Sequence, residues 1–84
     1  MDALVIAVIT NAGVAVPGAT VVWYNSANDE EVGRAVTDDS GVADTWITSG
    51  IRYATVQADG LGSKRSAEQN CPAPGPTLFT DMTF

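Results

Sequence analysis

The chain has 84 residues, which is enough for one small domain with a single core. Ten acidic and four basic residues give a net charge of −6, which makes nucleic acids and anionic membrane surfaces poor partners. The chain has no histidine and one cysteine, so it lacks the commonest general base, histidine-dependent triads and nearly every zinc or copper site. We therefore expect no enzymatic activity, no cofactor and no bound metal.

Short runs rich in β-branched residues alternate with turn residues along the whole chain, and helical periodicity is nearly absent. The first apolar run follows Asp2, lacks the basic flank of a signal peptide and is too short to span a membrane. In chain order, the predicted strands cover 3–10, 19–24, 32–37, 42–48, 52–58, 64–69 and 77–84. This pattern predicts an all-β fold, a seven-stranded antiparallel Ig-like β-sandwich that occupies residues 1–84 as one domain.

Alternation within the second predicted strand separates an apolar face from a mixed one. Ala19, Val21 and Trp23 lie on the first face, which we assign to the core because it has no polar member. Thr20, Val22 and Tyr24 lie on the other face, toward solvent. The sequence therefore predicts an inward Trp23 and an outward Tyr24.

The other tryptophan, Trp46, has polar neighbours on its own face of the predicted strand. Asp44 and Thr48 share that face and prefer water, so Trp46 and Val42 are expected to be exposed with them. A register shift of one residue would place Trp46 in the core instead. Soluble monomers tend to avoid exposed apolar surface, so we select Trp46, Val42 and Tyr24 as candidate protein-interaction residues.

Two further segments invite a chemical interpretation. The sequence from Asp38 to Gly41 is typical of a turn, although its carboxylates could alternatively contribute to a calcium site, which needs six to eight oxygens. Cys71 has no partner for an intramolecular disulfide and is expected to be a buried thiol. The proline-rich residues 72–76 that follow it predict a stiff connection from one sheet to the other.

Three stretches carry a resemblance to known families: 14–21 (VAVPGATV), 36–43 (VTDDSGVA) and 50–58 (GIRYATVQA). They look like the bacterial Ig-like domains of invasin and intimin type, and the closing residues 82–84 resemble the final strand of those modules. The same skeleton is similar to carboxypeptidase-regulatory-like, transthyretin-type sandwiches. Either resemblance implies a sandwich that serves as a spacer, adhesion module or accessory domain, and neither implies a catalytic residue.

These observations favour a non-catalytic structural module that acts through protein–protein contacts. Modules that resemble this one usually occur as tandem repeats, whereas this sequence holds one module beginning at Met1. We therefore expect a phage virion accessory, such as a head-decoration or tail-associated protein, bound to a capsid or tail and able to form homo-oligomers. The alternative is a spacer or adhesion repeat of a bacterial surface protein, located at the cell surface instead of the virion.

Overall fold

The computed structural model describes residues 1–84 and contains ten strands and no helix. In the first sheet, β1 (Asp2–Val8) lies between β10 (Thr77–Phe79) and β6 (Val42–Thr48). A separate small hairpin follows β1 and consists of β2 (Thr10–Asn11) and β3 (Val14–Ala15). The prediction of an all-β fold is thus confirmed.

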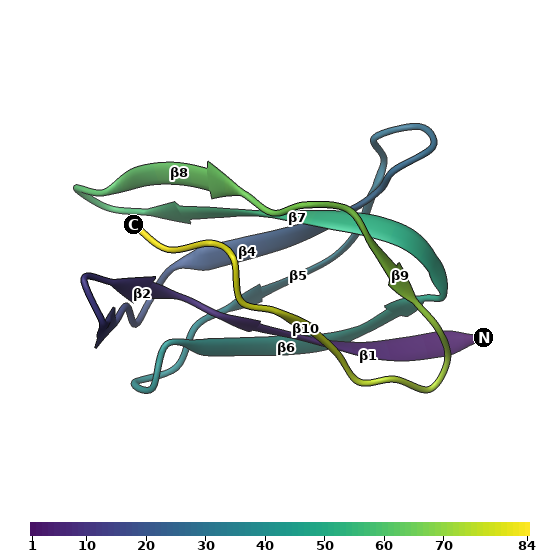
Figure 1. Ribbon diagram of the computed structural model, residues 1–84, viewed down its shortest axis with the longest axis horizontal. Coiled ribbons are helices and arrows are strands. Elements are labelled where there is room, and N and C mark those ends of the chain that lie inside the picture. The colour runs from purple at the N-terminus through teal and green to yellow at the C-terminus, as the bar shows by residue number, and fades with distance from the viewer.

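The second sheet is larger and is built around β7 (Gly50–Ala58). One side of β7 pairs with β4 (Thr20–Asn25), which in turn pairs with β5 (Glu31–Val36). The other side pairs with β9 (Gln69–Cys71) along the first part of β7 and with β8 (Gly62–Arg65) along the last part. Figure 1 shows the strands running along the long axis of the molecule.

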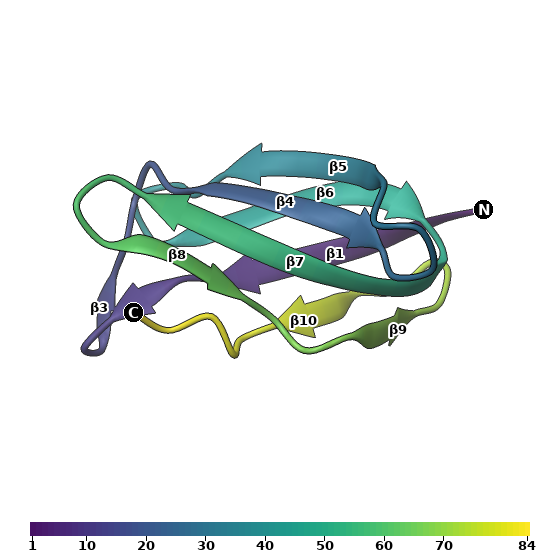
Figure 2. The same cartoon turned by 90° about the horizontal axis from the view of Figure 1, so that it is seen from above.

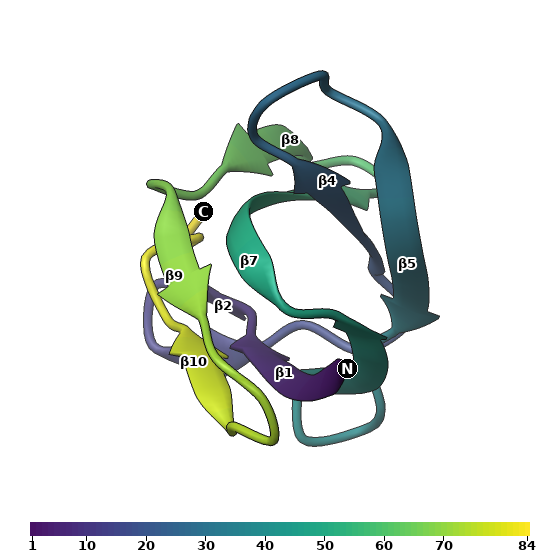
Figure 3. The same cartoon turned by 90° about the vertical axis from the view of Figure 1, so that its right-hand side faces the viewer.

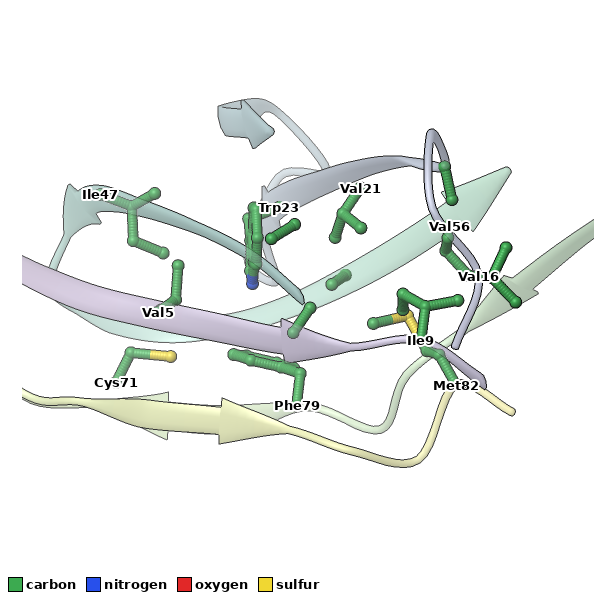
Figure 4. Packing of buried hydrophobic residues seen from close by; sticks show 14 of the residues in the cluster. Val5, Ile9, Val16, Val21, Trp23, Ile47, Val56, Cys71, Phe79 and Met82 are labelled. Carbon is green, nitrogen blue, oxygen red and sulfur yellow. The ribbon is translucent and has the colours of Figure 1, made fainter. Parts of the chain in front are cut away.

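The second sheet lies over the first, and the two inner faces enclose one hydrophobic core (Figures 2 and 3). Trp23 is fully buried in this core, as the alternation of its strand predicts, and its ring meets that of Phe79 edge to face at 6.2 Å and 77°. Each sheet contributes every second residue of its strands. The largest fully buried side chains are those of Trp23, Phe79, Ile9, Ile47, Met82, Val5, Val21, Val56 and Cys71 (Figure 4).

The prediction of purely antiparallel pairing is wrong for the last strand, because β10 runs parallel to β1. The proline-rich segment carries the chain from β9 of the second sheet to β10 of the first, as expected. It delivers β10 to the end of the molecule at which β1 also begins, so the two strands run in the same direction (Figure 1). Leu4 N–H donates to the Pro74 carbonyl and ties this connection to β1.

The prediction of seven strands is also wrong, since the chain forms ten. The predicted strand 64–69 is divided at Ser66, which is buried and exchanges hydrogen bonds with Ala54: its N–H donates to the Ala54 carbonyl and its hydroxyl accepts from the Ala54 N–H. The predicted strand 77–84 is also too long: β10 ends at Phe79, and beyond it the Asp81 carboxylate accepts a hydrogen bond from the Ala67 N–H. The hairpin of β2 and β3 accounts for the remaining strands.

The acidic turn between β5 and β6 is held by its own side chain. The Asp38 carboxylate accepts hydrogen bonds from the N–H groups of Ser40 and Val42, at 2.9 and 3.1 Å. Gly41 completes the turn at a φ of 76°, a conformation that favours glycine. The interpretation of this segment as a turn is confirmed.

The hairpin of β2 and β3 has a strained residue at its tip. Ala12 and Gly13 form its two-residue loop with φ angles of 51° and 84°, and this loop type favours asparagine at the first position. We expect Ala12→Asn to raise the free energy of unfolding by about 0.5–1 kcal/mol, measured by urea denaturation. Ala27→Asn, at an exposed loop position without a positive φ, is the control. A loss of stability in the Ala12 variant alone would contradict the expectation.

Candidate functional site

The outer face of the first sheet carries a group of apolar side chains. Leu4 lies opposite Trp46 and Val8 lies opposite Val42 in the pairing of β1 with β6. On the other side of β1, Ile6 is the register partner of Leu78. We call this set the apolar face: Leu4, Ile6, Val8, Val42, Trp46 and Leu78.

Two residues stand out from the apolar face toward solvent. Trp46 is 57% exposed and Leu78 is 53% exposed, and the other four members are half-buried. The predicted exposure of Trp46 is confirmed. An exposed apolar cluster of this kind is typical of a surface that contacts another protein.

The charged side chains on the strands of the first sheet are all acidic. Asp44 is the register partner of Ile6, and Asp2 is the partner of Thr48, so both carboxylates share the outer face with Trp46. The strands β1, β6 and β10 contain no lysine or arginine. The four basic residues lie in β5, β7 and β8 of the second sheet: Arg34, Arg52, Lys64 and Arg65.

The aromatic side chains on the outer face of the second sheet pack against each other and against Arg65, whereas Val36 and Ile51 on the same face are exposed. Tyr24 stacks on Tyr53 with ring centroids 5.2 Å apart, and the guanidinium of Arg65 lies 3.9 Å above the Tyr53 ring. Tyr53 is therefore only 7% exposed, although it points away from the core. Its hydroxyl donates to the Asp29 carboxylate at 2.9 Å, and this hydrogen bond raises the pKa of Tyr53. Val22 is buried on the same face.

The three candidate interaction residues do not form one surface. Trp46 and Val42 both belong to the apolar face of the first sheet. Tyr24 lies on the outer face of the second sheet, half-buried by its stack on Tyr53. The structure places it on the far side of the molecule from Trp46, because alternation in each strand points both side chains away from the shared core.

Sequence reasoning missed Leu4, Ile6, Val8 and Leu78. The first three belong to a continuous apolar run, and such a run is typical of a strand buried on both faces. Here the alternate residues of β1 are buried and the others are only half-buried, so one side of the strand faces outward. The polar residues of β6 could have indicated which residues of β1 point outward, because the two strands pair and register partners lie on the same face of the sheet.

Cys71 and Arg52 are buried, and the contacts of both side chains are within the protein. Cys71 is fully buried, and burial raises the pKa of its thiol, which keeps it protonated and unreactive at neutral pH. Arg52 points inward and its guanidinium donates to the backbone carbonyls of Thr48, Ser49 and Ile51. This arginine holds the tight connection between β6 and β7.

Comparison with known proteins yields no relative: no family model matches the sequence, and no curated protein matches it significantly. The structure contains no cluster of three or more histidine, cysteine, aspartate or glutamate residues that could hold a metal ion. No helix is present that is long and apolar enough to cross a membrane.

Proposed function

We propose that the protein is a non-catalytic binding module that docks on another protein through its apolar face. The observation that supports this most is the contrast between the aromatic side chains on its two outer faces. On the second sheet, Tyr24 and Arg65 cover the apolar ring of Tyr53. On the first sheet, Trp46 and Leu78 are each more than half exposed. A partner protein would supply there the cover that the chain provides for itself on the other side.

Trp46 is the expected anchor of the contact. Tryptophan is among the residues that dominate binding energy at interfaces, and truncating such an anchor costs about 2 kcal/mol or more. Trp46 lies on the edge strand β6, between Asp44 and Thr48 and opposite Leu4. Polar groups next to apolar ones are typical of protein interfaces.

The size of the face favours attachment to a repetitive assembly. Two strands of seven residues and one of three, about 4.8 Å apart, cover at most roughly 14 by 23 Å, less than the roughly 800 Å² per partner of a standard interface. One such contact is weak, whereas many copies bound to a repeating lattice hold by avidity. A phage virion accessory, such as a head-decoration or tail-associated protein, meets this requirement, with an Ig-like sandwich as its fold.

The second candidate function is a spacer or adhesion repeat of a bacterial surface protein. One specific observation favours it: the two termini lie at opposite ends of the long axis (Figure 1). This placement follows from the parallel pairing of β1 with β10. Modules with such termini can be joined end to end without a long linker.

Photo-cross-linking in the native setting tests the proposed function. Trp46 is replaced by the photoreactive residue benzoylphenylalanine, and Val36 is replaced in a matched control. Val36 is 61% exposed and lies on the outer face of the second sheet. We expect one discrete protein adduct from position 46 and none from position 36, because only the apolar face contacts the partner.

The identity of the adduct separates the two settings. A capsid or tail protein supports the virion accessory, whereas a neighbouring module of a long exported chain supports the surface repeat. Equal labelling from both positions, or no adduct from position 46 in the intact assembly, would overturn the proposed binding face.

A further inference from the structure

We infer that the partner places a cationic side chain, an arginine or a lysine, over the indole of Trp46, with apolar residues around it. This inference rests on the proposed function, since it names the chemistry that the apolar face recognises. Two observations carry it: the sign of the charges around Trp46, and the state of every basic residue in the chain.

The carboxylates nearest to Trp46 lie on its own face, on either side of it along the sheet. Asp44 is two residues away on β6, and Asp2 is paired with Thr48, two residues beyond Trp46 in the other direction. Both are exposed and neither forms an ion pair within the protein. An exposed indole attracts a cation to its ring face, and flanking carboxylates strengthen that attraction.

A second copy of this chain is a poor occupant of the face. Two apolar faces in contact would bring Asp2 and Asp44 against the same carboxylates of the other copy, with no basic residue on β1, β6 or β10 to offset them. The basic residues elsewhere are also engaged: Arg52 is buried, Arg34 pairs with Glu31 at 2.6 Å, and Arg65 lies over Tyr53.

Only Lys64 is left without such a contact, at the exposed β8 edge of the second sheet. Charge complementarity therefore points to a different protein, one that brings its own arginine or lysine to the apolar face. A guanidinium suits the site best because it is planar and can stack on the indole while its N–H groups reach the carboxylates.

A peptide titration of the isotope-labelled protein tests this inference. The probe is the blocked pentapeptide Leu-Arg-Leu-Arg-Leu, and the matched controls carry citrulline or glutamate in place of arginine. The indole N–H signals of the two tryptophans in the nuclear magnetic resonance spectrum report the site. We expect the arginine peptide to shift the Trp46 signal and leave that of the buried Trp23 unchanged. The neutral citrulline peptide should bind at least about tenfold more weakly.

Substitution of the carboxylates supplies the second arm. Asp2→Asn combined with Asp44→Asn should weaken the arginine peptide about tenfold, because the cation loses both neighbours. The double variant Glu30→Gln with Asp59→Asn makes the same change in net charge at exposed loop positions and should leave the affinity within a factor of about two. Equal effects of the two pairs would show attraction to the net charge alone and would overturn the inference.

Other outcomes overturn the inference and leave the proposed function to its own test. Equal binding of arginine and citrulline peptides at Trp46 means that the face docks proteins without a cation. Shifts of the Trp46 signal with protein concentration alone would make a second copy the occupant. No shift with any peptide would exclude recognition of this chemistry, and the cross-linking experiment would still decide whether position 46 contacts a protein.

Discussion

Trp23→Ala is expected to lower the free energy of unfolding by about 3–5 kcal/mol, whereas Trp46→Ala should change it by less than about 1 kcal/mol. Trp23 is the largest fully buried side chain, and its loss leaves a cavity between the sheets beside Phe79. Trp46 is more than half exposed on an outer face, so its removal opens no cavity. Urea denaturation followed by far-ultraviolet circular dichroism measures both values.

The comparison is informative because the same residue is removed from both faces of one protein. For a domain of this size a loss of several kcal/mol is a large share of the total stability, so the Trp23 variant should be partly unfolded without denaturant. The Trp23 indole nitrogen is buried without a hydrogen-bond partner, so removing it leaves no polar group unpaired. A large loss of stability in the Trp46 variant would mean that this side chain supports the core.

Gly41→Ala is expected to destabilise the protein by roughly 2–5 kcal/mol. Gly41 has a φ of 76°, and a Cβ added there would lie 2.5 Å from the carbonyl oxygen of Ile9 and 3.1 Å from the nitrogen of Val16. Both atoms belong to the backbone, and the Gly41 carbonyl also accepts the Ile9 N–H. The strain of the left-handed conformation therefore adds to a collision that the backbone has to move to relieve.

Gly60→Ala is the matched control for this variant. Gly60 has nearly the same φ, 78°, in the turn between β7 and β8, and a Cβ there would meet no atom within 4 Å. Its substitution should cost only the conformational strain, about 1–2 kcal/mol. Thermal and urea unfolding of both variants measure the difference. If the two substitutions lower the free energy of unfolding equally, the close approach of the Ile9 backbone does not contribute to the loss of stability at Gly41.

The sequence allowed much of the fold to be predicted because alternation is a local property of each strand. The bounds of β6 agree with the predicted strand 42–48, and the inward Trp23 and outward Trp46 follow from the period of two. The division between β8 and β9 depends on the hydroxyl of Ser66 meeting the backbone of Ala54 in another strand. The contact between Ser66 and Ala54 joins segments that are distant in the sequence, so no local pattern predicts it. The parallel pairing of β1 with β10 also joins distant segments and could not be predicted for the same reason.

The candidate site was predicted less completely than the fold. Trp46 and Val42 were found because polar neighbours on β6 identify the outward face. Tyr24 met the same criterion of an outward aromatic residue. Its stack on Tyr53 and the position of Arg65 above that ring join three different strands and become visible only in the folded protein. The direction in which a strand residue points follows from the local sequence, whereas the side chains that cover it come from distant parts of the chain.

The parallel pairing of the first strand, β1, with the last strand, β10, also has a mechanical consequence. Because β1 and β10 run in the same direction and the chain leaves them at opposite ends, tension applied to the two termini pulls the strands past each other lengthwise. The hydrogen bonds between them then share the load simultaneously instead of breaking one after another. Such a module would yield to a pulling force late and all at once.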